Sequence, residues 1–283
     1  MRAIRHLAWV HLIFVGLAQA HEPAEQVDAS VAAAQNASLV RKSEGKGFGP
    51  QSPRDLADKR GSNKRVFGSA PPTAQMNLCN IHFHKNAEHK GGEFVTFAGF
   101  GDGRGYGTGY KFSGQLSAAE SRPLDVEICP SEHGGLKAGD TIEVHFVHSS
   151  ARVGPGPTLN ACLDESIANP QLRVEARVFV LVNDARAADF VDLTALSEVN
   201  GYHQALNIPG DASNTIDYQG STTGPAYNEK ASPLQVSWSV GPQVTKVNAE
   251  SVGRWCNGNV FKEDHAHGVR NLVVDERWLS RME

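Results

Sequence analysis

The sequence lacks the features that would place it at once among nucleic-acid-binding, repeat or membrane-spanning proteins. Its 27 Lys and Arg are balanced by 31 Asp and Glu, so a net charge of −4 provides no basic surface for nucleic acid or an anionic membrane. There is no internal repeat and no alternation of strands and helices of the βαβ type. After the first 20 residues no apolar run is long enough to cross a bilayer. A chain of 283 residues with 40% hydrophobic content can still bury one sizeable core, so a globular domain is expected.

The first 20 residues have the composition of an export signal. Arg2 and Arg5 precede an apolar run from Leu7 to Leu17, and Ala18-Gln19-Ala20 supplies the small residues of a cleavage site. We therefore expect residues 1–20 to be a signal peptide. The mature protein is then exported, to a periplasm or out of the cell.

Cysteine is scarce, and its four copies lie far apart at Cys79, Cys129, Cys162 and Cys256. None belongs to a Cys-x-x-Cys pair, which disfavours a zinc ribbon or a thioredoxin-like redox site. In an exported chain, four cysteines predict two disulfides with three possible connectivities. Of these we expect Cys129–Cys162 and Cys79–Cys256. On a regular strand Cys79 falls on the face opposite to His82, so a structural role is expected for it.

The chain divides into two stretches after the signal. Residues 21–70 contain few aromatics and many turn-forming residues, which predicts an N-terminal arm with at most one short helix near Ala24–Leu39. Residues 71–283 alternate short β-like runs with Gly, Pro, Asn and Asp, and Ala187–Val199 is the best helical candidate. The expected strands are Leu78–His84, Gly92–Phe97, Leu124–Cys129, Thr141–His148, Leu172–Val182, Leu234–Val240 and Val244–Val247. The pattern predicts a single, mainly β domain on a twisted, mostly antiparallel sheet with long loops and few short helices.

A glycine-dense run from Gly99 to Gly109 superficially suggests a phosphate cradle. It lacks the Lys-Ser/Thr ending of a P-loop, and no helical pattern follows it. A surface loop is expected here.

Two histidines at alternate positions point to a metal site. If Asn80 to His84 is extended, then Asn80, His82 and His84 project to one face of the strand while Ile81 and Phe83 pack on the other. Two neutral imidazoles side by side leave polar nitrogens to satisfy, and a shared cation resolves that cost.

A second strand supplies a third ligand. In Thr141–His148, the side chains of Glu143, His145 and Val147 share one face. Glu143 is well placed to accept the second N–H of the His145 imidazole, as Asn80 is for His82. Three histidines with a vacant fourth position are the pattern of a catalytic rather than a structural zinc site.

At this point the residues resemble the carbonic anhydrases, specifically the delta class and, through shared site motifs, the alpha class. Four motifs occur in the same order over residues 47–270, and Gln51 to Leu56 is similar to another family segment. The motifs are His82-Phe83-His84 with Glu88-His89, then Glu143-Val144-His145-Phe146-Val147-His148, then Tyr218-Gln219-Gly220-Ser221-Thr222-Thr223-Gly224-Pro225, then Val236-Ser237-Trp238. The resemblance implies an alpha-carbonic-anhydrase-like fold and a carbonate dehydratase that interconverts carbon dioxide and bicarbonate through zinc-bound hydroxide.

The resemblance also implies roles for individual residues. His82, His84 and His145 would hold Zn²⁺, oriented by Asn80 and Glu143. Thr223 would accept a hydrogen bond from the nucleophile and donate one to Glu88. Val147 and Trp238 would line the pocket for carbon dioxide. Thr222 stands where the family has leucine, so Thr222 and Thr223 could exchange roles. The segment before His82 is too short to hold the usual proton-shuttle histidine. His203, His148 and His133 are possible shuttles, and a surface or packing role is favoured for each.

Two other functions stay open at this stage. In a cupin-type oxygenase, His82, His84, Glu88 and His145 would together bind iron or manganese, with Glu88 as a direct ligand. A non-catalytic exported metal-binding protein would keep the histidines but would not need Glu88 and Thr223. His265-Ala266-His267 follows a polar stretch without a strand pattern, and we interpret it as surface.

Overall fold

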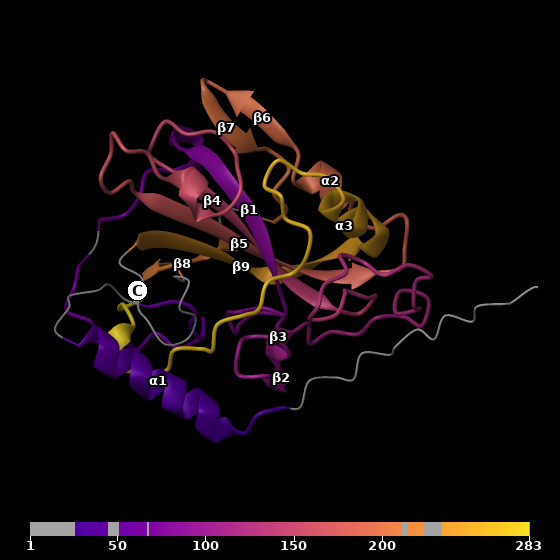
Figure 1. Cartoon of the computed structure of the whole chain (residues 1–283), viewed down its shortest axis with the longest axis horizontal. Helices are drawn as coiled ribbons and strands as arrows, with labels where there is room; N and C mark the ends of the chain where they lie inside the picture. The colour runs from indigo at the N-terminus through magenta and orange to yellow at the C-terminus, as the bar shows by residue number, and fades with distance from the viewer. Residues whose placement is uncertain (1–25, 45–50, 67, 211–213, 223–233, 283) are drawn as a thin grey trace, which may run out of the picture.

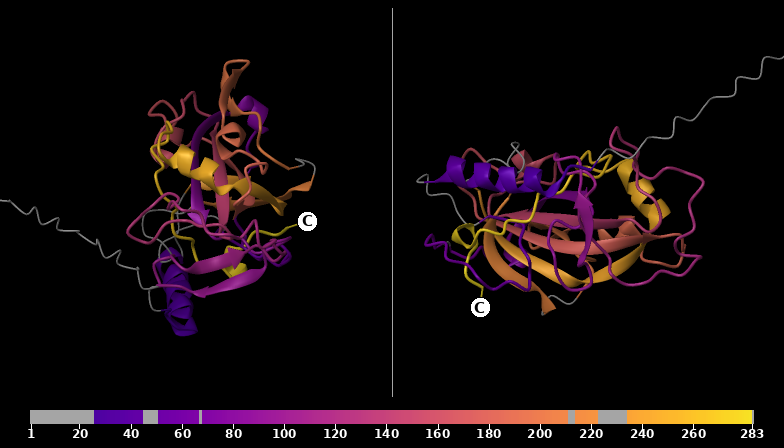
Figure 2. Two further views of the ribbon diagram at one scale, coloured as in Figure 1. Left: turned by 90° about the vertical axis from the view of Figure 1, so that its right-hand side faces the viewer. Right: turned by 90° about the horizontal axis from the view of Figure 1, so that it is seen from below.

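The computed structural model describes residues 26–44, 51–66, 68–210, 214–222 and 234–282. A five-stranded sheet in the order β1-β4-β5-β9-β8 lies at its centre (Figure 1). The strands are Asn77–Lys85 (β1), Thr141–Ser149 (β4), Leu172–Val182 (β5), Ile216–Ser221 (β8) and Gln235–Asn248 (β9). Neighbouring strands are antiparallel except β5 and β9, which are parallel. The expected mainly β, mostly antiparallel architecture is confirmed, and the twist of the sheet is evident in Figure 2.

Each face of the sheet carries an apolar cluster, because alternate residues of a strand point to opposite sides. On one face, Phe83 and Phe146 belong to a cluster completed by Phe190 and Trp255. These last two residues come from the helices α2 (Phe190–Leu193) and α3 (Ala249–Cys256). The other face carries the cluster that contains Val147 and Trp238. The histidines expected to bind metal alternate with the first cluster, so they face the second.

Two hairpins extend the domain beyond the sheet. They are formed by β2 (Thr96–Phe100) with β3 (Thr108–Lys111), and by β6 (Leu196–Val199) with β7 (Tyr202–Ala205). The helix expected at Ala187–Val199 is therefore wrong except for the four residues of α2. Asn200 and Gly201 adopt positive φ angles of 52° and 79°, which suits the two-residue turn of a tight hairpin. The strand expected at Leu124–Cys129 is also wrong, since only Ile128 there forms a bridge, to Leu136.

Helix α1 (Ala29–Ser43) is the main helix of the N-terminal segment. The Asp28 side chain caps its first turn by accepting the Ser30 N–H, and Leu39 packs in a small apolar cluster with Trp278 and Leu279. Before and within this helix, Gln26 and Gln35 bond to backbone groups of the glycine run, so that loop is partly covered. Within the described ranges no helix has the length and hydrophobicity to cross a membrane. The boundary at residue 70 between arm and domain stays a prediction.

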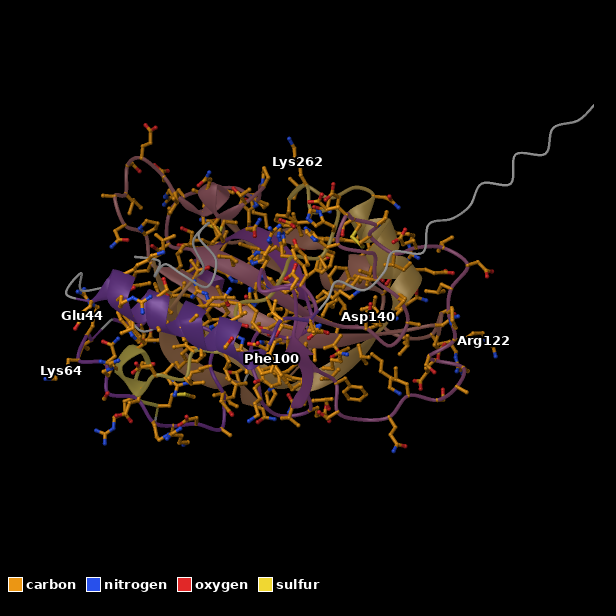
Figure 3. All side chains as sticks on the ribbon, turned by 60° about the horizontal axis from the view of Figure 1, so that its bottom comes forward. Glu44, Lys64, Phe100, Arg122, Asp140 and Lys262 are labelled. Carbon is orange, nitrogen blue, oxygen red and sulfur yellow. A yellow bond between two sulfur atoms is a disulfide. The ribbon has the colours of Figure 1, made fainter. Side chains whose placement is uncertain are left out.

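The C-terminal segment covers the open edge of β1. The His267 N–H donates to the Phe83 carbonyl, and the Lys85 N–H donates to the His267 carbonyl. Figure 1 shows this segment passing from α3 across the sheet toward α1. Charged residues such as Lys64, Arg122 and Lys262 extend outward from this body (Figure 3). Pairing of an edge strand removes a row of exposed backbone groups.

The two disulfides join Cys79 to Cys162 and Cys129 to Cys256, so the expected pairing is wrong. A β-bulge between Leu78 and Asn80 interrupts the alternation of β1. Because of this bulge, Leu78 packs in the first cluster and Cys79 in the second. Cys79 therefore lies on the same face as His82, and the expectation that it lies on the opposite face is wrong. From there the Cys79 sulfur reaches the short 3₁₀ turn Leu159–Cys162. The structural role of Cys79 is confirmed.

Candidate metal centre

The antiparallel pairing of β1 with β4 brings the two histidine motifs together. His82 lies opposite His145, and His84 lies opposite Glu143. One ring nitrogen from each of His82, His84 and His145 lies within 4.8 Å of the others. The period-two pattern of both strands therefore predicted this grouping correctly.

The hydrogen bonds of His82 and His145 leave one nitrogen of each free toward the other. His82 Nδ1 donates to Asn80 Oδ1 at 2.7 Å, and His145 Nε2 donates to Glu143 Oε1 at 2.9 Å. The remaining nitrogens, His82 Nε2 and His145 Nδ1, are 3.3 Å apart. Each carries a lone pair, so a cation between them would convert a repulsive contact into an attractive one. Burial, reinforced by the neighbouring His145 and His267, holds the pKa of His82 well below its usual value, which keeps it neutral as a ligand must be.

His84 completes the group from the same face of β1. Its side chain is buried, and its Nδ1 has no hydrogen-bond partner among the described residues. Its ring centroid lies 4.7 Å from that of His145 and 5.2 Å from that of His82. Burial also holds the pKa of His84 well below its usual value.

Glu143 is a fully buried carboxylate that accepts four hydrogen bonds. Its Oε1 receives His145 Nε2 at 2.9 Å and His89 Nδ1 at 2.6 Å. Its Oε2 receives the backbone N–H groups of Glu88 and His89 at 2.7 and 3.2 Å. Burial alone would raise the pKa of Glu143, but the two imidazoles hold it well below its usual range. The residue is therefore a fixed negative charge beneath the metal ligand.

A chain of hydrogen bonds continues from Glu143 to the far side of the site. His89 Nε2 lies 2.6 Å from the Tyr218 hydroxyl, which in turn donates to Ser52 Oγ at 3.0 Å. Burial raises the pKa of Tyr218 above its usual value. The sequence motifs contained His89 and Tyr218, but this network was not predicted, because it joins a loop, a distant strand and the segment before residue 60. His89, Glu143 and His145 also form a second close group, which these hydrogen bonds explain without a metal.

Glu88 lies beside the three histidines but is held by another partner. Asn86, with a φ of 69°, turns the chain at the end of β1 and returns Glu88 toward the site. Glu88 Oε1 accepts the backbone N–H of Arg270 at 3.0 Å and lies 3.8 Å from His84 Nε2. Burial raises the pKa of Glu88 above its usual value. A cupin arrangement would require Glu88 to lie in one group with the three ligand nitrogens. Glu88 does not belong to that group.

Two of the residues expected to form the substrate pocket lie on the histidine side of the sheet. Val147 and Trp238 are both buried in the second cluster, and the Trp238 ring lies edge-on to His145 with centroids 5.0 Å apart. Thr222 is buried directly after β8. Thr223 lies outside the described residues.

Of the other histidines discussed in the sequence analysis, His267 lies in an unexpected place. His267 was interpreted as surface, yet its half-exposed ring lies 5.9 Å from the ring centroids of both His82 and His84. Its Nε2 donates to Glu263 Oε2 at 2.6 Å, an acidic partner that the sequence pattern did not indicate. His148 is buried on the opposite face of β4, and His133 stacks on Tyr106. Neither reaches the histidine group, which agrees with the packing and surface roles favoured for them.

The three histidines fit a divalent metal. In tetrahedral zinc coordination with Zn–N bonds of about 2.0–2.1 Å, two ligand nitrogens stand roughly 3.3–3.4 Å apart. The 3.3 Å between His82 Nε2 and His145 Nδ1 agrees with that spacing. Asn80 and Glu143 satisfy the outer nitrogens of these two ligands, as is usual around bound metals.

Comparison with known proteins identifies the family. The model of the family described as delta carbonic anhydrase matches residues 73–251, which is more than half of the chain. No curated protein sequence matches significantly. Among solved structures, an alpha-carbonic anhydrase from Photobacterium profundum is 15% identical, with 85% of this chain and 93% of that chain covered and a TM-score of 0.28. The alpha-carbonic anhydrase of Thermovibrio ammonificans, in complex with the inhibitor sulfanilamide, is 18% identical, with coverages of 79% and 84% and a TM-score of 0.26. Dioscorin complexed with ascorbate is 16% identical, with coverages of 83% and 85% and a TM-score of 0.30. The family model carries the assignment: this chain belongs to the delta carbonic anhydrase family and is a carbonate dehydratase with a histidine-rich metal centre.

Proposed function

We propose that the metal is zinc and that His82, His84 and His145 hold it for the reversible hydration of carbon dioxide. The 3.3 Å approach of His82 Nε2 to His145 Nδ1, with both outer nitrogens already bonded, is the observation that carries this proposal. An all-imidazole set suits zinc, whereas magnesium and calcium prefer oxygen ligands. When bound to three histidines, zinc lowers the pKa of a coordinated water to about 7, which supplies hydroxide near neutrality.

The neighbouring residues would orient the ligands. Asn80 and Glu143 fix which nitrogen of His82 and of His145 carries the proton, and so keep the lone pairs directed at the metal. The four donors around Glu143 hold its carboxylate in one orientation. Neither residue needs to move during turnover.

Glu88 and Thr223 would control the direction of attack. We assign Glu88 the acceptor role: fixed by the Arg270 N–H, its carboxylate accepts the hydroxyl proton of Thr223. With its own hydrogen donated to Glu88, the threonine oxygen would accept a hydrogen bond from the nucleophile and so orient it toward the carbon of carbon dioxide. Val147, Trp238 and Thr222 form the adjoining wall, and a buried apolar wall suits a nonpolar gas.

Two substitutions separate metal binding from catalysis. We expect His145→Ala to lose both zinc and activity, measured by metal analysis and stopped-flow carbon dioxide hydration. Thr223→Ala should keep a full complement of zinc and lose about 100-fold in kcat/KM, the usual cost of one aligned hydrogen bond to the reacting group. Thr222→Ala is the comparison variant: it removes a hydroxyl from the pocket wall and not from the nucleophile, so it should lose much less activity than Thr223→Ala. If the Thr222 variant is the inactive one, then the two threonines have exchanged roles. Full zinc content in the His145 variant would disprove the ligand assignment.

The competing functions are disfavoured on separate grounds. The family match contradicts the cupin-type oxygenase, and the bond from Arg270 N–H to Glu88 explains that carboxylate without making it a ligand. A metal carrier without activity would not need the proposed hydrogen bond between Thr223 and Glu88, so the Thr223→Ala experiment also tests that alternative.

The proposed site of action is an exported, oxidising compartment. The two disulfides support this proposal, because such bonds persist mainly outside the cytosol. The expected signal peptide, residues 1–20, lies outside the described residues. Detection of the mature protein with an N-terminus at His21 in a periplasmic or culture fraction would test both expectations.

A further inference from the structure

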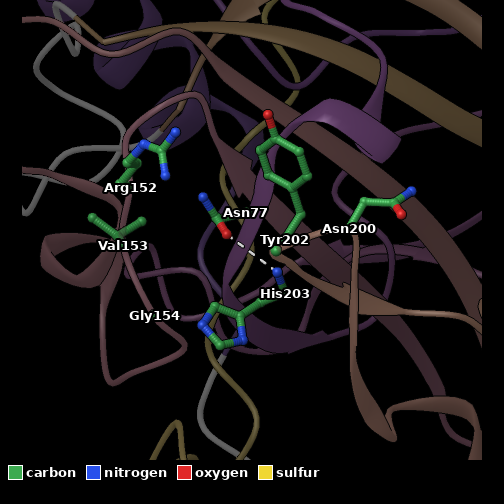
Figure 4. A pocket seen from close by; sticks show the side chains of 8 residues that line it. Asn77, Arg152, Val153, Gly154, Asn200, Tyr202 and His203 are labelled. Carbon is green, nitrogen blue, oxygen red and sulfur yellow. Dashed lines mark hydrogen bonds between the residues drawn. The ribbon is translucent and has the colours of Figure 1, made fainter.

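A cavity lies away from the metal centre, between the loop after β4 and the β6–β7 hairpin. It has a volume of about 370 Å³, which is within the range of small-molecule sites. Residues 152–154 form one side and residues 200–203 the other, with Asn77 between them (Figure 4). Asn77 precedes His82 by five positions on β1. At the usual rise of a strand this separates the cavity from His82 by roughly 16 Å.

The walls of this cavity are fixed before any ligand arrives. Asn77 Nδ2 donates to the Ala151 carbonyl at 2.9 Å, and Asn77 Oδ1 accepts the His203 N–H at 3.1 Å. One side chain therefore ties the loop to the hairpin. The Cys79–Cys162 disulfide anchors the far end of the same loop to β1. A site with preformed walls binds without a large ordering cost.

Arg152 brings a positive charge to the rim of the cavity. Within the described part of the chain, the Arg152 guanidinium has no hydrogen-bond or ion-pair partner, and no residue lining the cavity is acidic. The exposed Arg60, Arg186 and Arg277 each pair with an aspartate two positions earlier, whereas Arg152, like the exposed Arg122, keeps its donors available; what sets Arg152 apart from Arg122 is its place on the cavity. Five N–H donors at the mouth of a fixed cavity are thus available to a ligand.

We propose that this cavity is a binding site for a small oxyanion, a carboxylate or a phosphate, with Arg152 as the principal contact. The planar guanidinium matches two oxygens of either group at once, and charge-assisted bonds of this kind are the strong ones. The Tyr202 hydroxyl and the His203 imidazole are further donors from the opposite wall. In Figure 4 the Tyr202 hydroxyl points to the top of the view, and the Asn200 side chain points away from Arg152. Half-buried Val153 offers an apolar surface for the body of an organic anion.

NMR titration of the zinc-loaded enzyme tests this site separately from the metal centre. Inorganic phosphate and then acetate are added at constant ionic strength, while the backbone amide signals of Gly154 and Gly201 are followed. We expect saturable shifts of both signals with at least one anion. Arg152→Gln should weaken that binding by about tenfold to a hundredfold, as loss of a charge-assisted pair implies. Arg122→Gln removes the same charge from an exposed loop position with no part in the cavity, and should leave the affinity unchanged.

Three outcomes would overturn the proposal. They are equal affinity in wild type and Arg152→Gln, shifts confined to the amides of His82 and His84, and no saturable shift with either anion. Arg152→Lys guards against a trivial loss of structure, because it keeps the charge without the planar fork. We expect this variant to bind with intermediate affinity and to retain the wild-type amide spectrum outside the loop. Comparison of phosphate with acetate then decides which oxyanion the cavity prefers.

Discussion

The Glu143→Gln substitution tests how the buried carboxylate supports the metal ligand. The change is nearly isosteric, but it replaces one of two oxygens by an NH₂ group where four donors and no acceptor converge. If the NH₂ faces the backbone, it opposes the N–H groups of Glu88 and His89. If it faces the imidazoles, His145 must move its proton to Nδ1, the nitrogen assigned to the metal. The first orientation leaves two hydrogen bonds unmade, and the second makes them only at the cost of the tautomer that the metal requires.

The expected cost follows from the burial of this group, whose exposed fraction is 0%. Hydrogen bonds to a charged group are worth about 1.5–3 kcal/mol each, and removing one partner of a buried charged pair costs about 3–5 kcal/mol. We therefore expect a loss of about 3–5 kcal/mol in the free energy of unfolding of the zinc-free protein, measured in urea. Loss of a carboxylate behind a metal-bound histidine should also weaken zinc affinity about tenfold to a hundredfold. Competition with a chromophoric chelator measures that affinity.

Glu175→Gln is the matched control for this experiment. Glu175 lies on the neighbouring strand β5, opposite Phe146 in the register, so it is on the face away from the histidines. Its substitution should leave zinc affinity unchanged. A Glu143→Gln protein with wild-type zinc affinity and a stability within about 0.5 kcal/mol of wild type would refute the role assigned to this carboxylate.

Three further predictions concern a buried histidine, a disulfide and the metal itself. Burial lowers the pKa of His148 from 6.5 to about 4, so the unfolded chain takes up a proton near pH 6.5 that the folded chain takes up only near pH 4. The free energy of unfolding should therefore fall by about 3 kcal/mol through His148 as the pH drops from 6.5 to 4, and should not depend on His148 above pH 6.5. The His148→Asn substitution should reduce the slope of unfolding free energy against pH by about one proton over that range. Parallel profiles of variant and wild type would contradict this. Replacing Cys79 and Cys162 by serine opens a loop of 83 residues and should cost about 4–5 kcal/mol in urea unfolding. It should also weaken zinc binding, because Asn80 Nδ2 bonds to the carbonyl of Gly156 on the loop that this disulfide anchors, whereas removal of the other disulfide should spare zinc affinity. Chelation of the metal should lower the thermal midpoint of the wild type, since a ligand bound only by the folded chain stabilises it; an unchanged midpoint would show that no metal was bound.

The grouping of the three histidines was the most predictable feature of the molecule. His82, His84 and His145 share one side of two strands, and the period of two fixes that side from the sequence alone. The same alternation assigned Asn80 and Glu143 their partners correctly. Local periodicity sufficed because the two strands are direct neighbours in register.

Features that depend on contacts between segments far apart in the sequence were not predictable in this way. His267 reaches the histidine group through bridge pairing with β1, and no local pattern encodes that docking. The disulfide pairing depended on the bulge beside Cys79, which a regular alternation cannot reveal. The helix expected at Ala187–Val199 failed for a different reason: Asn200-Gly201 was a recognisable hairpin turn, and its two positive φ angles outweighed the helical spacing before it.

The covering of the β1 edge has a consequence for the order of assembly. Residues 267–270 follow all strands of the sheet in the chain, yet they supply the bonds that fix the Phe83 carbonyl and the Glu88 carboxylate. Because the chain is synthesised from its N-terminus, the strands of the sheet can pair before residues 267–270 are available to dock on β1. The metal centre therefore reaches its final geometry only late in folding, after these residues have docked.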